Sequence, residues 1–371
     1  MEASSSKNRK GTRSSRSRGG GGGGGGGAGG GSGGKAMNVY PPLRIGQYEV
    51  SGRLGSGGMA ETFRAIARGP GGYTREVVIK CILPHLTEDE RYVRMFIAEA
   101  RILGMLNHPN IVHVYDFGED ESRHFLALEY IDGPSLSQIQ EEIGRSGQSV
   151  PPAVAAYIGR EICLALAAVH ELRGPDGDLL NVVHRDVTPS NIMVTLAGGV
   201  KLLDFGVAHL GSPGSATRSR SIKGKPAYFA PEQIVSADID GRVDLFALGV
   251  VLHELLSGQP LFWSDNDLGI VYKIMEAPQV PPSSVKPGIS PELDAVVMRA
   301  LQRNPALRFQ TAAEMAGALD AVVVAAGLRR EEVSEFVSRF EGARGGAATP
   351  RDTTMNFKGA GLDNKTRGKQ P

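Results

Sequence analysis

The chain has 371 residues and a formal net charge of +1, from 41 Lys and Arg against 40 Asp and Glu. This balance leaves no long field of one sign and excludes an obvious nucleic-acid-binding body. The two cysteines, Cys81 and Cys163, fit a reducing compartment and have no metal-binding spacing. No apolar stretch approaches the roughly 20 residues of a membrane span, and the N-terminal segment lacks the apolar core of a secretory signal. We therefore expect a cytoplasmic protein.

Both ends of the chain are poor in large apolar residues. Residues 1–36 combine a Ser/Arg/Lys-rich opening with a glycine run, and residues 342–371 are similarly polar. Such segments cannot bury enough apolar area to offset chain entropy, so we predict disorder for 1–47, including a short lead-in, and for 342–371. The basic opening is interpreted as a solvated tail, with contact to nucleic acid or membrane as the less favoured alternative.

The first part of the packed unit shows the alternation of an antiparallel sheet. The segment from Tyr48, YEVSGRLGSGGMAETFRAIA, predicts two strands joined by a glycine-rich turn, and REVVIKCI predicts a third. A helix is expected over EDERYVRMFIAEARILGML, with Glu99 and Leu103 on one face, and it should end before HPN because proline limits continuation. The segments IVHVYDFG and HFLALEYI again read as strands.

Beyond Gly133 the pattern becomes helical. The segments PAVAAYIGREICLALAAVHEL and DLFALGVVLHELLSG predict long helices, the second closing on a Ser-Gly stop. We predict an α+β protein with a small antiparallel-sheet lobe at 48–131, a larger helical lobe at 132–323 and a helical extension at 324–341. The junction near Glu129 to Gly133 should form a hinge beside a ligand cleft.

Two features of the first lobe suggest phosphate binding. The run Gly55-Ser56-Gly57-Gly58 can approach phosphates closely because it lacks side-chain bulk, although a hairpin turn alone would explain it. A strand follows these glycines, which argues against a dinucleotide-binding fingerprint. Lys80 closes an apolar strand and Glu99 lies on an apolar helix face. Each alone is more often an exposed charge, but together they predict an ion pair that positions the lysine on ATP phosphates.

The segment VVHRDVTPSNIMV, followed by VKLLDFGVAH, carries the most specific signal. Asp186, Asn191 and Asp204 have the spacing with which two neighbouring loops deliver a base and two metal ligands. Their oxygens suit Mg²⁺, with Mn²⁺ as an alternative. We expect Asp204 to hold the ion, Asn191 to serve a second site, and Asp186 to accept the proton of the incoming hydroxyl.

With these motifs in order, the chain from about Tyr48 to Val323 resembles the eukaryotic-like (Hanks-type) Ser/Thr protein kinases of bacteria. The shared motifs are LGSGGMAETF, VVIK, the helix of Glu99, HPNIV, LEYIDG, HRDVTPSN, DFG, APE, DLFALG and the late Arg308. The resemblance implies the two-lobed protein kinase fold. It also implies transfer of the γ-phosphoryl group of Mg-ATP to Ser/Thr hydroxyls of a protein substrate. The sequence carries no signal for an oligomeric state.

The resemblance also assigns individual residues. It implies that Glu129–Ile131 form the hinge against the adenine and that Glu232 and Arg308 form a buried ion pair. It also implies that Asp244 supports the backbone of the catalytic loop. The preference of carboxylates for the start of a helix would also explain an aspartate at position 244. The implied ATP-binding residues are Leu54, Gly55, Ser56, Gly57, Gly58, Met59, Ala60, Glu61, Thr62, Val78, Lys80, Leu128, Glu129 and Ile131.

The chain departs from the family pattern at four positions. Ala60 replaces a glycine and Thr62 replaces the valine that covers adenine, so we expect altered affinity and retained binding. Thr188 stands where most members carry a lysine, and Lys225 stands where they carry a threonine. We hypothesise that Lys225 restores the ammonium group near Asp186 and the γ-phosphate, with Thr188 completing the hydrogen bond. The alternative is an inactive pseudokinase scaffold that binds nucleotide or a partner.

Control is expected from the segment before APE. Arg185 precedes the catalytic aspartate, and a buried arginine needs an anion, which in similar kinases is often an activation-segment phosphate. Thr217 and Ser219 are the best-aligned candidates for autophosphorylation, although a Ser-rich loop without a control function is the alternative. Pro189 fits the Ser/Thr kinase pattern better than the tyrosine kinase pattern.

Overall fold

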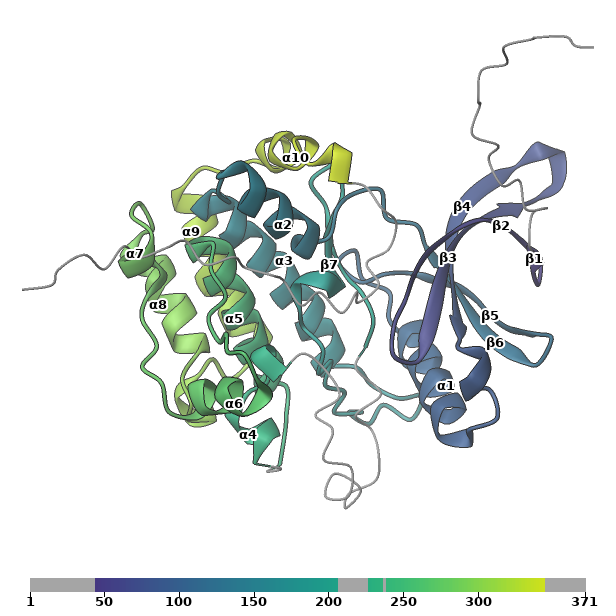
Figure 1. The fold of residues 1–371 in the computed structure, drawn as a ribbon, viewed down its shortest axis with the longest axis horizontal. Helices are drawn as coiled ribbons and strands as arrows, with labels where there is room; N and C mark the ends of the chain where they lie inside the picture. The colour runs from purple at the N-terminus through teal and green to yellow at the C-terminus, as the bar shows by residue number, and fades with distance from the viewer. Residues whose placement is uncertain (1–43, 206–225, 236–237, 344–371) are drawn as a thin grey trace, which may run out of the picture. The chain divides into compact units, whose positions relative to one another are not determined.

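The computed structural model describes residues 44–205, 226–235 and 238–343 (Figure 1). The chain divides into two units, 1–41 and 42–371, and the described residues all lie in the second. Within them, an antiparallel sheet of six strands is followed along the chain by a predominantly helical region. The predicted α+β arrangement of two lobes is therefore confirmed.

The sheet has the strand order β1-β2-β3-β4-β6-β5, with every neighbouring pair antiparallel. The strands are β1 (Arg44–Ile45), β2 (Tyr48–Ser56), β3 (Ala60–Arg68), β4 (Thr74–Ile82), β5 (Val114–Asp120) and β6 (Arg123–Glu129). Five of them follow the alternating stretches read from the sequence. The glycine-rich turn joins β2 to β3, as the pattern predicted.

Strand β1 lies inside the segment predicted to be a disordered lead-in, so that prediction is wrong for residues 44–47. Ile45 pairs with Tyr48 and is buried. The turn also reaches the far edge strand, because Gly46 N donates to Asp120 Oδ2 at 2.9 Å and the Tyr48 hydroxyl donates to Asp116 Oδ2 at 3.1 Å. One apolar residue and two β5 carboxylates thus order this segment.

The two faces of the sheet serve different cores, because side chains alternate along a strand. Phe63, Ile79 and Phe125 belong to a cluster confined to the sheet lobe. Val78 and Leu126, on the other face, join the large core that continues into the helical lobe. Lys80 lies opposite Leu126 in the ladder, so its side chain is delivered to the face that meets the helices.

Helix α1 (Glu90–Met105) packs against this face and contacts β4, β5 and β6. The Asp89 carboxylate caps its N-terminus by accepting from Arg91 N at 3.0 Å. The helix buries Phe96, Glu99 and Leu103 and ends before the HPN segment, as predicted.

The helical lobe surrounds helix α5 (Arg242–Ser257), which is buried from Val243 to Ser257 and is capped by Gly258, whose φ of 74° is in the left-handed region. The predicted Ser-Gly stop is confirmed. The other helices are α2 (Leu136–Ser146), α3 (Pro152–His170), α4 (Pro231–Ile234), α6 (Asp267–Met275), α7 (Pro282–Val285), α8 (Pro291–Ala300), α9 (Ala312–Ala325) and α10 (Arg330–Ser338), and the strands β7 (Ile192–Val194) and β8 (Val200–Leu202) form a hairpin.

Helix α3 is 19 residues long and, by length and composition alone, apolar enough to cross a membrane. The expectation that no segment approaches that length is wrong for this helix. Most of α3 is buried, and it packs against α5 and α9. Its apolar character is that of a central core helix, covered on several sides by other helices.

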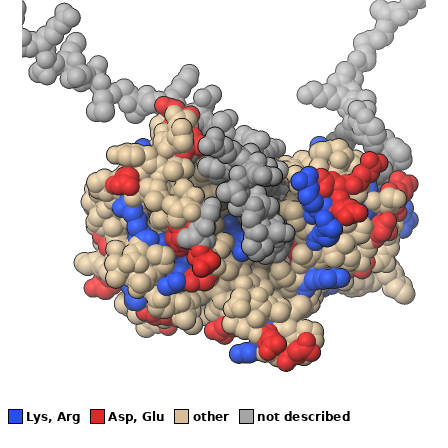
Figure 2. Space-filling model, turned by 90° about the horizontal axis from the view of Figure 1, so that it is seen from below, with Lys and Arg blue, Asp and Glu red and all other residues tan. Residues whose placement is uncertain are grey.

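The surface carries charges of both signs. In the face shown in Figure 2, blue and red side chains alternate over the described residues and form no single large field. This agrees with the near-zero net charge of the chain.

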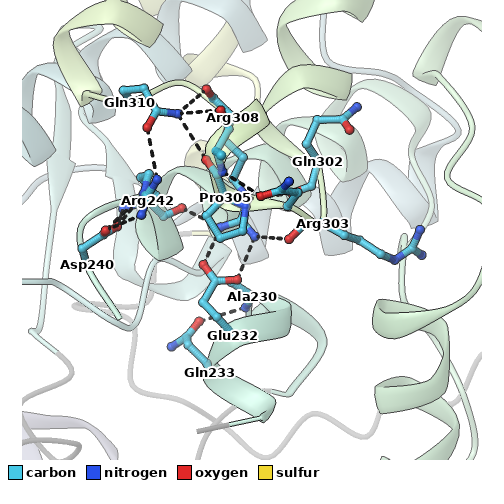
Figure 3. A network of polar contacts seen from close by, with 12 residues as sticks. Ala230, Glu232, Gln233, Asp240, Arg242, Gln302, Arg303, Pro305, Arg308 and Gln310 are labelled. Carbon is cyan, nitrogen blue, oxygen red and sulfur yellow. Dashed lines mark hydrogen bonds and ion pairs between the residues drawn. The ribbon is translucent and has the colours of Figure 1, made fainter. Parts of the chain in front are cut away.

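A buried ion pair fixes the start of α4 to the segment before α9 (Figure 3). Arg308 is fully buried and donates to both Glu232 oxygens, at 2.6 and 2.8 Å. Its remaining donors reach the carbonyls of Gln302, Arg303 and Arg242. The predicted Glu232–Arg308 pair is confirmed, and its guanidinium is surrounded by acceptors.

Removing one partner of this pair should be costly. We predict that Glu232→Ala lowers the free energy of unfolding by about 3–5 kcal/mol, because the Arg308 charge stays buried without its counter-ion. Glu141→Ala, which breaks the exposed pair with Arg145, should cost less than about 1 kcal/mol. Urea denaturation followed by circular dichroism measures both. Equal losses would contradict the assignment.

Candidate functional site

Three charged side chains from different elements meet at the junction of the lobes. Lys80 Nζ on β4 lies 2.7 Å from Glu99 Oε1 on α1 and 3.0 Å from Asp204 Oδ1, which follows β8. Lys80 and Glu99 are both buried. The predicted Lys80–Glu99 ion pair is confirmed, and Asp204 is its third member.

Electrostatics keep Lys80 charged in this position. Burial alone would lower the pKa of its ammonium group, but the Asp204 and Glu99 carboxylates outweigh burial and raise that pKa above its ordinary value. Burial raises the pKa of the Glu99 carboxyl, and the neighbouring Lys80 opposes this rise. The site therefore presents a fixed cation flanked by two carboxyl groups.

The loop that carries Asp186 is held by buried polar contacts. His184 is fully buried, its Nε2 lies 2.8 Å from the Leu203 carbonyl, and its ring lies 4.7 Å from that of Phe205. Arg185 has a φ of 66°, in the left-handed region where a side chain is strained. Such strain persists only where the surroundings fix the backbone.

Asp244, in the first turn of α5, supplies that restraint. Its Oδ2 accepts from His184 N at 2.8 Å and its Oδ1 accepts from Arg185 N at 2.7 Å. His170 Nε2 lies 2.8 Å from the same Oδ2. Burial would raise the pKa of the Asp244 carboxyl, but the contacts with His170, His184 and Arg185 lower it. The predicted support of the catalytic loop by Asp244 is confirmed.

Asp186, Asn191 and Asp204 come from two adjacent segments. Asn191 Nδ2 donates to Asp186 Oδ2 at 2.7 Å and to its carbonyl at 2.9 Å. Asn191 O accepts from Leu203 N at 2.8 Å, where the β7–β8 ladder continues. Asp204, directly after Leu203, is thereby brought beside Asn191. The three predicted residues converge. Asn191 turns its amide nitrogen to Asp186, and among the described residues its side-chain oxygen accepts no hydrogen bond.

This donor set fits a hard cation. Within the described residues, no three His, Cys, Asp or Glu side chains converge as a metal site. Asn191 and Asp204 offer protein oxygens, which suits Mg²⁺, because that ion usually takes few protein ligands and completes its shell with water and phosphate.

A cleft between the lobes continues from these residues to the hinge. It is lined by Thr62, Val78, Val112, Leu128, Glu129, Ile131, Met193, Leu203 and Asp204. Apolar side chains from both lobes dominate it, which suits a flat aromatic base. Among the described residues, no hydrogen bond involves the backbone N–H of Ile131, so this buried donor is available to the edge of such a base.

Other predicted ATP-binding residues have different surroundings. The Glu61 carboxylate contacts Arg123 at 2.5 Å and Arg53 at 3.2 Å, so its side chain is occupied outside the cleft. Leu54, Gly55, Ser56, Gly57, Gly58, Met59 and Ala60 form the β2–β3 turn and its flanks and are not among the residues lining the cleft. Thr188 is buried and lines a small pocket with Asp186 and Tyr228. Lys225, Thr217 and Ser219 lie outside the described residues.

The structure adds residues that the sequence interpretation missed. Val112, Met193 and Leu203 line the cleft beside predicted residues. Lys201 on β8 donates to Glu129 Oε2 at 2.7 Å and so ties the hinge to the strand before Asp204. The apolar strand directly before the DFG segment could have indicated that Leu203 lines the cleft. The partner of Lys201 could not be predicted in this way, because it depends on tertiary packing.

Comparisons with known proteins agree with this geometry. Residues 48–318 match the protein kinase domain family. The chain is 39% identical over 275 residues to the tyrosine-protein kinase MasK of Myxococcus xanthus, covering 74% of this chain and 43% of MasK. It is 37% identical over 280 residues to the serine/threonine-protein kinase PknB of Mycobacterium leprae, covering 74% of this chain and 43% of that protein. The chain therefore spans less than half the length of these relatives.

The fold also has solved counterparts. The crystal structure of the Mycobacterium tuberculosis PknI kinase domain superimposes with a TM-score of 0.58 at 26% identity. The match covers 78% of this chain and all of that domain. The two-lobed arrangement is thus shared with a known kinase domain.

The Asp244 contacts predict a measurable effect on the loop. Asp244→Asn should lower the free energy of unfolding by about 2 kcal/mol, because an amide nitrogen then faces a buried N–H donor that has lost its acceptor. Asp267→Asn, at an exposed position in the first turn of α6, is the matched control and should change stability by less than about 0.5 kcal/mol. Chemical denaturation compares them, and an unaffected Asp244→Asn protein would refute the role of Asp244.

Proposed function

This chain belongs to the protein kinase family, among the bacterial Hanks-type members, and we propose that it transfers the γ-phosphoryl group of Mg-ATP to Ser and Thr hydroxyls of proteins. The observation that carries this proposal is the convergence of Lys80, Asp204, Asn191 and Asp186 at one end of an apolar cleft. The activity of a longer protein that includes this unit is part of the same proposal.

The described residues divide the chemistry among themselves. The Ile131 N–H and the apolar walls bind the base, and the Lys80 ammonium, fixed by Glu99, meets the phosphates. Asn191 and Asp204 would hold Mg²⁺, which when bound neutralises charge on the phosphates. Mn²⁺ would use the same oxygens.

Asp186 is the proton acceptor in this proposal. The substrate hydroxyl oxygen bonds to the γ-phosphorus, the bond from that phosphorus to the bridging oxygen of ADP breaks, and the hydroxyl proton passes to the Asp186 carboxylate. Asn191 holds one Asp186 oxygen at 2.7 Å, which orients the carboxylate before the substrate arrives.

The choice of Ser/Thr rests on similarity and on the catalytic loop. PknB is named a serine/threonine kinase, and Pro189 in this chain matches that pattern. MasK is named a tyrosine kinase, and the type of phosphorylated residue distinguishes the two acceptor classes. We also propose autophosphorylation at Thr217 and Ser219, which would supply the anion expected for Arg185.

The central experiment uses labelled Mg-ATP and a generic protein acceptor. We predict phosphoserine and phosphothreonine as products, with the rate reduced at least about 100-fold in Asp186→Asn. Asp178→Asn, at an exposed position before the catalytic loop, should keep the native rate. Mass spectrometry of the chain after incubation locates autophosphorylated residues. Phosphotyrosine alone would refute the proposed acceptor class, and nucleotide binding without transfer in the native chain would favour a scaffold.

The Thr188 and Lys225 exchange predicts a double-mutant result. Lys225→Ala alone should remove most phosphotransfer, by about 10-fold or more, because the ammonium near the γ-phosphate is lost. Thr188→Lys combined with Lys225→Thr should retain transfer, because the lysine at position 188 then supplies the ammonium group near the γ-phosphate. Initial rates at saturating ATP compare the variants. A fully active Lys225→Ala enzyme would end this hypothesis.

A further inference from the structure

Helix α10 lies beyond the region that matches the kinase family, which ends at residue 318. It is nevertheless part of the packed core, because Val333, Phe336 and Val337 are buried, and Phe340 just after it is buried as well. All four join the same core cluster as the cleft residues Met193 and Leu203. The segment is therefore an integral part of the folded unit.

The polar contacts of α10 converge on one feature, the β7–β8 turn. The Ser334 hydroxyl donates to the Leu196 carbonyl, and Arg330 Nε donates to the Ala197 carbonyl at 2.9 Å. Gly198 has a φ of +76°, and a Cβ there would lie 2.7 Å from the Arg330 carbonyl oxygen. Such a close approach requires glycine. The helix therefore fits closely against this turn.

The same hairpin carries the floor of the cleft. Asn191 directly precedes β7, Met193 lies within it, and Leu203 and Asp204 follow β8. The hairpin is also bonded to the segment that leaves the hinge, because Val194 N donates to the Pro134 carbonyl and Leu196 N donates to the Asp132 carbonyl, each at 3.0 Å.

Leu196 joins these two sets of contacts. Its N–H is bonded to the hinge side and its carbonyl to Ser334 of α10. A shift of α10 would therefore move the turn, and through a hairpin of only three residues on each strand it would reach Met193 and Leu203. In Figure 1, α10 is drawn at the top of the helical lobe, above the labels of α2 and β7.

We propose that Ser334 and Arg330 of α10 are positioning residues that hold the β7–β8 hairpin against the hinge segment and thereby set the floor of the nucleotide cleft. Neither residue is among those that line the cleft. They act through the backbone of Leu196 and Ala197. The expected effect on ATP binding rests on the proposed kinase function. The support of the hairpin by α10 does not depend on that function.

The test uses the full chain with Arg330→Ala/Ser334→Ala and, independently, Gly198→Ala. The matched control is Glu331→Ala/Glu335→Ala, which changes exposed residues of the same helix. We expect the first two variants to raise the ATP KM by about fivefold with a smaller change in kcat. Without the contacts from α10, the β7–β8 hairpin spends less time in the position that binds the nucleotide. The control should match the native protein.

Amide hydrogen exchange supplies a readout that needs no activity. The Val194 and Leu196 amides should exchange at least about fivefold faster in both test variants and at the native rate in the control. Native exchange at these amides together with a native KM in Arg330→Ala/Ser334→Ala would overturn the proposal. A fall in thermal stability with an unchanged KM would also overturn it. Absence of phosphotransfer in the native chain would refute the kinase proposal, whereas the exchange result would still decide the role of α10.

Discussion

The arrangement of the lobes depends on the burial of one ammonium group. Lys80 Nζ lies in the protein interior, and a charge there is tolerated only beside opposite charges at short range. Glu99 comes from α1 and Asp204 from the segment after β8, so satisfying this one group requires the strand, the helix and the second lobe to take up one relative position. The alignment of the site follows from that requirement.

The remaining buried charges follow the same logic in the helical lobe. Asp244 is buried at the start of α5 and is satisfied by two backbone N–H groups and His170. Arg308 is buried and satisfied by Glu232 and three carbonyls. In each case a polar side chain on a rigid helix or its flank fixes a segment that has no regular structure. These contacts place the catalytic loop and α4 relative to α5.

The sequence predicted the parts of this structure that depend on local pattern or fixed spacing. Strand alternation located the sheet, helical periodicity located α1 and α5, and the spacing of Asp186, Asn191 and Asp204 identified the converging loops. It failed where distant packing decides. Strand β1 is ordered by Asp116 and Asp120 of β5, far along the chain. The ion pairs of Glu61 with Arg53 and Arg123 also depend on tertiary packing, and the sequence made no prediction about them.

The same distinction explains why α10 was visible only as a helical extension. Its apolar positions predict a helix with a buried face, but they do not say which surface that face covers. The surface is decided by Gly198, whose lack of a side chain admits the α10 backbone, and by the carbonyls of Leu196 and Ala197 at the hairpin turn, which accept hydrogen bonds from α10. A short hairpin has few internal hydrogen bonds with which to hold its own geometry. The strand pair beneath the cleft therefore depends on a helix that lies outside the motifs by which the family is identified.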